Sequence, residues 1–378
     1  MTWIALKMLV GNPTKYLAII LGVAFATLLI AQQSSIFWGL MTLTSSQIRD
    51  VRGADIWVMD PNVQFIDDIK PLSENDLYRV RGVAGVDWAV RLYKGLTRAR
   101  LADGNFQQII LLGLDDASMV GAPQEMTLGT LANLRRPDAI IMDEHGYRQL
   151  WPDEPFQLGK EFEMNDKRAV LVGVCKASKT FQTFPIVYTR YSQATRFVPR
   201  ERKVLSFILA NPEPGVTSQA ACQAIREQTK LQAVTRAEFV EQTIWYYMRK
   251  TGIPINFGIT VLLGFIVGTA VAGQTFYLFT VENIKQFGAL KAMGASNLRI
   301  VGMVLLQATV VGLIGFGLGA GGAAAFGQLP RLADRLAYNM TWQILTGTGA
   351  AVVLIVILSS VLSIRRVLVV EPAIVFQG

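Results

Sequence analysis

Four stretches of the sequence contain no Asp, Glu, Lys or Arg over lengths that can cross a lipid bilayer. They cover residues 16–41, 253–280, 300–326 and 344–364. A helix needs about 20 apolar residues to span the hydrocarbon core, and a charge at its centre costs at least about 2.5 kcal/mol. Because lipid offers the backbone no hydrogen bonds, each stretch is predicted to be a transmembrane helix.

The long segment between the first and second stretches, residues 42–252, carries ordinary charge and has the size of a soluble domain. Some of its runs are rich in β-branched and aromatic residues, which is typical of strands. These runs cover residues 55–59, 87–102, 107–114, 139–142, 168–175, 184–190 and 203–210. Helices are predicted after Ser73, whose capping pattern includes Asp76, and over residues 217–230 and 236–249.

The resulting fold class is an α-helical membrane protein with four transmembrane helices and an inserted mixed α/β domain of two lobes. Both ends of the inserted segment, about residues 50–120 and 203–235, are expected to form one lobe. The part between them, about residues 121–202, is expected to form the other. Pro254 is predicted to kink the chain where the domain leads into the second transmembrane helix.

Basic residues flank the apolar stretches, and cytoplasmic loops carry an excess of Lys and Arg. Lys7 and Lys15 precede the first stretch, which predicts a cytoplasmic N-terminus that begins with a short amphipathic helix. The segments predicted to be cytoplasmic are residues 1–15, 281–299 and 365–378. Residues 42–252 and the short loop 327–343 are then outside, although Arg331 and Arg335 in that loop run against the bias.

The sequence shows no catalytic, cofactor-binding or metal-binding constellation. His145 is the only histidine, which disfavours His-based triads and excludes Cys/His zinc sites. The net charge is +8, but the Lys and Arg residues form no dense basic stripe, so nucleic acid is not an expected partner. Asp67 and Asp68 are interpreted as solvated loop residues. Whether Cys175 and Cys222 form a disulfide is open from sequence.

An aromatic group, Trp245, Tyr246 and Tyr247, precedes the second apolar stretch. Aromatic residues gather where a membrane meets water, so an interfacial belt is the first interpretation. Contact with a lipid substrate is the alternative.

The connection between the second and third stretches is polar but keeps helical spacing. In ENIKQFGALKAMGASNLRI, the residues Ile284, Phe287, Leu290 and Met293 share one predicted face. Gly294 is expected to end this helix, and Ser296 can cap the next one. Such a helix either contacts a cytoplasmic partner or lies on lipid, and the residues alone favour neither.

The run KQFGALKAMGAS, residues 285–296, resembles the signature of FtsX-like permeases, the MacB family of ABC transporter membrane subunits, which includes the DevC-like, mechanotransmission-type members. Gln286 stands where the family has an acidic residue, and Gln307 where a Glu is common in the third span. The opening WIALKMLVGNPTKYLAIILGVAFA and the ending SIRRVLVVEPAIVF are also similar to that family. The order of one span, a large domain and three spans agrees with it.

The resemblance implies a membrane subunit that is not itself an enzyme. The family pairs with an ATP-binding subunit, and no G-x-x-x-x-G-K-[ST] loop occurs here, so ATP and Mg²⁺ are expected on a partner ATPase. Two copies of the chain are expected to form a homodimer. The residues implied in ATPase coupling are Glu282, Lys285, Gln286, Phe287, Leu290, Lys291 and Met293, with residues 3–10 and 365–376 beside them.

The function implied is a permease of the bacterial inner membrane that turns ATP hydrolysis into motions of a periplasmic domain and drives export. A periplasmic membrane-fusion adaptor, an outer-membrane channel and membrane lipid are the other expected partners. Extraction of lipoproteins or lipids from the inner membrane is one alternative. A regulator of a periplasmic hydrolase, which transports nothing, is another.

Small residues recur at four-residue spacing in two of the spans. Gly264 with Gly268 forms one such pair, and Gly315 with Gly319 forms another. Gly317 and Gly321 form a third. Such pairs let helices approach closely, either at a dimer seam or within one subunit. The family resemblance points to the first and second spans as the dimer contact.

Overall fold

The computed structural model describes residues 2–11, 13–101, 104–198, 205–329 and 336–369. The chain divides into two units. One, here called the helical unit, joins Met1–Leu40 to Gly252–Gly378, and the other, the α/β domain, covers Met41–Thr251. Residues 331, 335 and 371–376, which figured in the sequence argument, lie outside the described residues.

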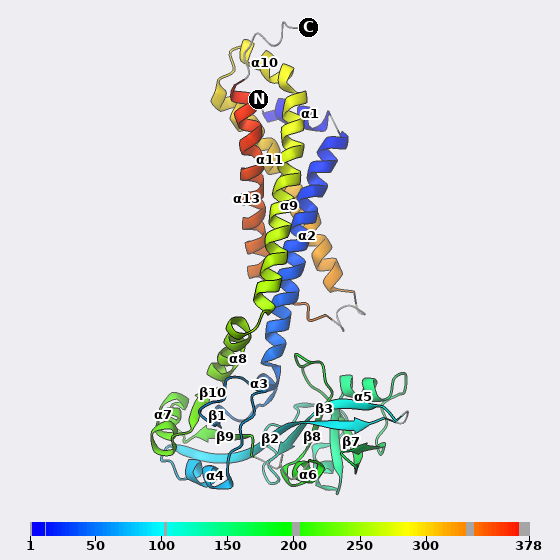
Figure 1. Cartoon of the computed structure of the whole chain (residues 1–378), viewed down its shortest axis with the longest axis vertical. Coiled ribbons are helices and arrows are strands. Elements are labelled where there is room, and N and C mark those ends of the chain that lie inside the picture. Colours follow the sequence, from blue (N-terminus) through cyan, green and yellow to red (C-terminus); the bar gives the residue numbers. More distant parts are fainter. Residues whose placement is uncertain (1, 12, 102–103, 199–204, 330–335, 370–378) are drawn as a thin grey trace. The chain divides into compact units, whose positions relative to one another are not determined.

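The helical unit is built from long apolar helices and two short ones (Figure 1). They are α1 (Thr2–Val10), α2 (Pro13–Thr44), α9 (Ile253–Glu282), α10 (Ile284–Ala292), α11 (Asn297–Gly327) and α13 (Trp342–Leu368). Among the described residues, α2, α9, α11 and α13 are long and apolar enough to cross a membrane. These four helices and the mixed α/β domain confirm the predicted fold class, an α-helical membrane protein with an inserted α/β domain.

The chain does not enter the second span as one kinked helix. Two residues, Thr251 and Gly252, separate the end of the preceding helix, α8 (Arg236–Lys250), from the start of α9 at Ile253. Pro254 lies in the first turn of α9, where its missing N–H removes no helical hydrogen bond. Pro254 therefore starts a helix here, in contrast to the kink expected from sequence.

The α/β domain surrounds a sheet whose strands come from all parts of the segment. Its strands are β1 (Ile56–Met59), β2 (Val86–Arg100), β3 (Phe106–Leu114), β4 (Glu125–Gly129), β5 (Ala139–Asp143), β6 (Glu161–Met164), β7 (Lys167–Lys176), β8 (Ile186–Arg190), β9 (Phe207–Pro212) and β10 (Gln232–Thr235). Its helices are α3 (Ser46–Asp50), α4 (Glu74–Arg81), α5 (Glu144–Leu150), α6 (Tyr191–Phe197), α7 (Ser218–Thr229) and α8, with a 3-10 turn over Leu131–Arg135.

The strands follow the order β10-β1-β9-β2-β3-β8-β5-β7-β4, and β6 pairs with β2 and β7. The long strand β2 serves two groups of strands. Val86 to Leu92 pair with β9, whereas Tyr93 to Arg100 pair with β3. Since β3 also pairs in parallel with β8, it belongs to the second group. The change of partner thus falls inside β2, within the segment 50–120 that is expected to belong to one lobe.

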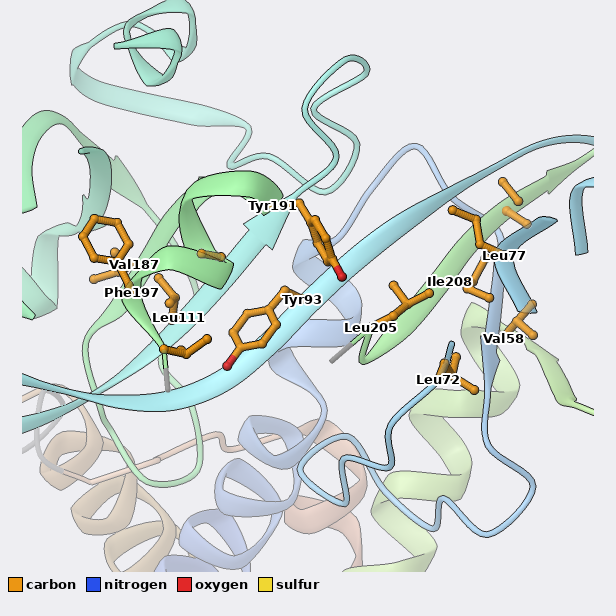
Figure 2. Packing of buried hydrophobic residues seen from close by; sticks show 14 of the residues in the cluster. Val58, Leu72, Leu77, Tyr93, Leu111, Val187, Tyr191, Phe197, Leu205 and Ile208 are labelled. Carbon is orange, nitrogen blue, oxygen red and sulfur yellow. The ribbon is translucent and has the colours of Figure 1, made fainter. Parts of the chain in front are cut away.

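Two hydrophobic cores lie on the two faces of this sheet. Alternate residues of β2 enter different cores, with Ala89 and Tyr93 in one and Val90 and Leu92 in the other. This is the period of two that a strand imposes on its side chains. Figure 2 shows Tyr93 in the first core, with Leu111 toward one end of it and Leu205 toward the other.

The two cysteines are both free and buried, and each lies in a different core. Burial in apolar surroundings raises the pKa of the Cys222 thiol to about 12. The pKa of Cys175 is raised as well, again mainly by burial. The disulfide that the sequence left open is therefore not formed in this structure.

Several helix ends follow the sequence pattern closely. Ser73 and Asp76 form the expected capping box of α4, with reciprocal bonds between side chain and backbone. Thr217 caps α7, which ends at Lys230 in a left-handed conformation. The capping box of α8, made by Thr235 and Glu238, was not recognised from sequence. Three short strands, β4, β6 and β10, were also missed.

Candidate functional site

The inward face of α10 is packed against three other helices of the same unit. Phe287 is fully buried against Ile300 on α11 and Val367 on α13. Leu290 is buried against Ala5 on α1 and Met303 on α11. Because buried apolar contacts resist displacement, α10 is attached to α1, α11 and α13 as one packed group.

Polar bonds reinforce these attachments. The Lys291 ammonium donates to the carbonyl of Leu368 at 2.9 Å, which ties α10 to the end of α13. The Gln307 amide is buried and donates to the carbonyl of Ala5 at 2.8 Å, which ties α11 to α1. An ionised carboxylate only accepts hydrogen bonds, so Gln307 makes a bond that an ionised Glu at this position would not.

The chain reverses sharply between α10 and α11. Gly294 has a φ of 89°, a left-handed conformation that glycine adopts without steric cost, and its N–H donates to the carbonyl of Lys291. The Ala295 N–H donates to the carbonyl of Leu290. The stop predicted at Gly294 is present. Ser296 occupies the N-cap position of α11, but its side chain makes no capping bond, contrary to expectation.

Two large apolar side chains are exposed at this reversal. Met293 is 75% exposed and Leu298 is 82% exposed. Met293 was expected on the same face as Phe287 and Leu290, but those two side chains are buried within the chain and Met293 is not. Since α10 ends at Ala292, the next residue no longer follows the helical rotation and lies outside. Met293 and Leu298 are called the turn pair below.

The seven residues proposed for coupling separate into groups. Phe287 and Leu290 are buried, and Lys291 bridges to α13. The exposed members are Glu282, Lys285, Gln286 and Met293. The structure also adds Asn283, which was not singled out from sequence. Its buried amide donates to the carbonyl of Phe279 at 2.8 Å, where α9 ends and α10 begins.

The glycines of the spans lie where α2 comes close. A Cβ added at Gly315 would lie 2.7 Å from a methyl group of Val23, and one at Gly319 would overlap the backbone of Ala24. Gly268 likewise faces Ala26 on α2, and Gly264 faces Leu29. Gly268, Gly315 and Gly319 therefore make room for packing within one chain, whereas a Cβ at Gly264 would lie 3.4 Å from Leu29, an ordinary contact. Gly317 and Gly321 meet no described atom within 4 Å.

The aromatic group before α9 does not form a uniform interfacial belt. Tyr246 stacks on Phe65 of the same α/β domain, with ring centroids 4.1 Å apart. Tyr247 meets the edge of Phe65 at 5.5 Å. Trp245 remains half exposed and lies under the guanidinium of Arg249. Two of the three rings are thus packed inside the domain.

Asp67, interpreted from sequence as a solvated loop residue, is also part of this region. Its carboxylate pairs with the buried ammonium of Lys94, which also donates to the carbonyl of Ile66 at 3.1 Å. Burial lowers the pKa of Lys94, and the nearby Asp67 opposes that shift. Nothing in the sequence of β2 marked Lys94 as buried.

Comparison with known families covers both units. The MacB-like periplasmic core domain family matches residues 16–228, which is more than half of the chain. The FtsX-like permease C-terminal family matches residues 242–372, which include α10, the turn pair and Gln307. The chain belongs to the FtsX-like permease family. The resemblance drawn from residues 285–296 is confirmed.

Individual relatives of this FtsX-like permease are distant. Uncharacterised ABC transporter permeases of Mycobacterium tuberculosis and Mycobacterium bovis are 25% identical over 228 residues. The match covers 58% of this chain and 58% of each relative's length.

Two solved structures also match the chain. The periplasmic region of MacB from Actinobacillus actinomycetemcomitans has a TM-score of 0.40 and 15% identity, over 52% of this chain and 95% of that one. The extracellular domain of YknZ, a noncanonic ABC-type transporter from Gram-positive bacteria, has a TM-score of 0.35 and 15% identity, over 48% and 98%.

Proposed function

We propose that this FtsX-like permease is the membrane subunit of an ABC transporter, driven by an ATPase that resides on another chain. The observation that carries the proposal is the contrast between the two sides of the α10 region. Phe287 and Leu290 fix α10 to the helical unit, whereas the turn pair beside it is exposed. An exposed apolar patch on a firmly attached element suits a partner that binds there and pushes.

Force applied to α10 can pass to the other helices of the helical unit through named contacts. It reaches α11 through Phe287 and Ile300, and α13 through Val367 and the bond from Lys291. It reaches α1 through the contact of Leu290 with Ala5. The chain continues from α2 and α9 directly into the α/β domain. In this proposal, ATP-driven closure of the partner moves these helices, and the α/β domain acts on the exported substrate.

The finer assignments are part of the same proposal. The chain is a homodimer in a bacterial inner membrane, with both termini in the cytoplasm, and its partner ATPase carries ATP and Mg²⁺. A periplasmic adaptor and an outer-membrane channel complete an efflux assembly. The homodimer is supported by the largely exposed surface of α9. Only 17% of the most apolar window of α9 is buried within the chain, against 44% in α2, α11 and α13.

The test replaces the turn pair without touching the packed side of α10. Met293→Asp with Leu298→Asp should abolish co-purification of the ATPase and lower its stimulated ATP hydrolysis by about tenfold or more, because charged side chains replace an apolar contact. Membrane insertion should be unchanged, since both positions are exposed. Leu290 is unsuitable for this test, because an Asp at a buried position would disturb folding itself.

Leu329→Asp is the matched control, because Leu329 is an exposed leucine just beyond the other end of α11. This variant should bind the ATPase normally. Normal ATPase binding by the double turn variant would refute docking at this turn. Loss of binding in both the turn variant and the control would also refute it.

A further inference from the structure

A cavity of about 820 Å³ opens within the α/β domain, separate from the proposed docking turn. Its lining comes from the point where β2 changes partners, from the loop that holds Phe65 and Asp67, and from the end of α8. Gly95 leaves room for the Tyr93 ring, which lines the cavity, because a Cβ at Gly95 would overlap that ring. The volume is in the range of cavities that bind small molecules.

Aromatic rings form one wall of this cavity. Phe65 and Tyr246 are stacked, and Tyr247 meets both of them edge-on. Phe181 lies against Tyr247 with ring centroids 5.1 Å apart. The faces of such rings carry partial negative charge, which attracts cations.

The charge that faces the cavity is negative. Among the described residues of the lining, Lys94 and Asp67 are the charged ones. The Lys94 side chain is only 3% exposed and is held by Asp67 and the Ile66 carbonyl, whereas Asp67 is 37% exposed. The ammonium is therefore enclosed behind the carboxylate. A carboxylate accepts several hydrogen bonds, so Asp67 can accept from a further donor.

We propose that this cavity binds an organic cation, an ammonium group carried on an apolar or aromatic body. The apolar body contacts the aromatic wall, and the ammonium lies between the ring faces and the Asp67 carboxylate. An anion of the same shape would meet the exposed carboxylate. An uncharged molecule would cover the exposed side of that carboxylate without offering it a counter-charge, which is unfavourable. The site does not depend on the ATPase.

Two sources can supply this chemistry, a free hydrophobic cation or the ammonium headgroup of a phospholipid. Thr251 lines the cavity and lies two residues before α9, a helix apolar enough to cross a membrane. A lipid headgroup can therefore supply the ammonium group, and the experiment must separate it from a free cation.

The experiment uses the full chain in nanodiscs of phosphatidylglycerol, with saturation-transfer NMR to measure binding. The probes are benzyltrimethylammonium and phenylacetate, which share an aromatic ring and carry opposite charges. Benzyltrimethylammonium should bind saturably, and phenylacetate at least about tenfold more weakly. Tyr246→Leu should weaken cation binding about fivefold, because a ring face is removed.

The decisive variant is Asp67→Asn with Lys94→Met, which removes both charges and leaves neither one buried alone. It should retain the circular dichroism of the folded chain and lose the preference for the cation. Glu161→Gln is the control, since Glu161 belongs to an exposed ion pair with Arg168 outside the lining, and it should bind normally. Equal binding of both probes, or unchanged cation preference in the folded double variant, would overturn the proposal.

Phosphatidylethanolamine in the nanodisc identifies the source. If headgroups occupy the cavity, this lipid should weaken benzyltrimethylammonium binding in the wild-type chain. If free cations are the ligand, binding should be the same in both lipids. Either result supports the cation site, provided that the charge preference is present in phosphatidylglycerol.

Discussion

In the helical unit, leucines of α9 and α11 are exposed beside glycines that are buried, whereas the α/β domain buries most of its largest apolar side chains. Leu262 on α9 and Leu313 on α11 are exposed, while Gly315 and Gly319 are buried. In the α/β domain, Trp57 is buried. Water drives large apolar groups into a core, but lipid is as apolar as leucine, so helices there depend on close packing. The two units are therefore built for different solvents.

Polar side chains differ between the units as well. In the helical unit, Thr27 donates to the carbonyl of Val23 and Ser360 to that of Val356, each one turn back in its own helix. In the α/β domain, polar side chains form caps and ion pairs, such as the one between Lys94 and Asp67. A hydroxyl that bonds to its own helix has little need of a neighbour, whereas a buried ion depends on its partner.

The strongest test of this contrast is a glycine on the packed face of α11. Gly319→Leu should prevent assembly of the helical unit, with a cost above about 4 kcal/mol, because the new side chain overlaps the backbone of α2. Gly321→Leu should be tolerated, since no described atom lies near it. Size-exclusion profiles after detergent extraction would distinguish them. Equal stability of the two variants would mean that close helix packing does not hold this unit together.

The next largest effect concerns pH and the α/β domain. Asp143 is buried and accepts from the backbone N–H groups of Ile186 and Gly146. Burial raises its pKa to about 6, against hydrogen bonds that lower it. The folded state then holds a proton that the unfolded state releases near pH 4. The contribution of Asp143 to the free energy of unfolding should therefore fall by about 3 kcal/mol as pH rises from about 4 to 6. It should stay constant above pH 6.

Thermal unfolding of the wild-type chain and Asp143→Asn, followed by circular dichroism of the sheet at pH 4.5 and pH 7, would measure this contribution. The stability of the wild-type chain relative to Asp143→Asn should be lower at pH 7 than at pH 4.5. The helical unit should not share the effect, because Glu282 is the only acidic residue in its four long helices. A pH response that is the same in both proteins would contradict the role of Asp143.

A somewhat smaller effect is expected at the buried ion pair of the α/β domain. Asp67→Asn alone should destabilise the domain by about 2–3 kcal/mol, because it leaves the Lys94 ammonium without its counter-ion. The value lies at the low end for buried pairs, since Asp67 is partly exposed. Asp67→Asn with Lys94→Met should be nearly neutral. Hydrogen exchange of β2 amides would report both, and additive losses in the double variant would exclude a coupled pair.

The smallest effect compares one helix cap from each unit. The Thr235 side chain accepts from the N–H of Glu238 at 3.2 Å, so Thr235→Ala should cost about 1 kcal/mol. Ser296 makes no such bond, so Ser296→Ala should cost only a few tenths of a kcal/mol. Thermal unfolding of each variant measures the difference. Equal losses would show that position in the cap, and not the hydrogen bond, determines the stability.

Much of the fold could be predicted because the signals were local. The four spans followed from the absence of charge, and the end of α10 from Gly294. The lobe boundary near residue 120 stays a prediction, and only the strand pairing shows that β2 is shared between two groups of strands. Short strands such as β4 and β10 carry too few residues for a recognisable period.

The candidate site was predicted in part for the same reason. Residues 285–296 were identified from their pattern, yet their helical spacing placed Met293 on one face with Phe287 and Leu290, which are buried. The structure exposes Met293 because the helix ends before it, and it adds Leu298 to the same reversal. The helical spacing of apolar residues does not show at which residue the helix ends.

The sequence alone determined which segments can enter lipid and to which family the chain belongs, because hydrophobic length and the order of short motifs are properties of consecutive residues. Only the tertiary structure decided that α2 fills the space beside the glycines, and that Lys94 is enclosed behind Asp67. Those contacts join residues far apart in the chain. Their energies depend on burial and on neighbours, which no local pattern encodes.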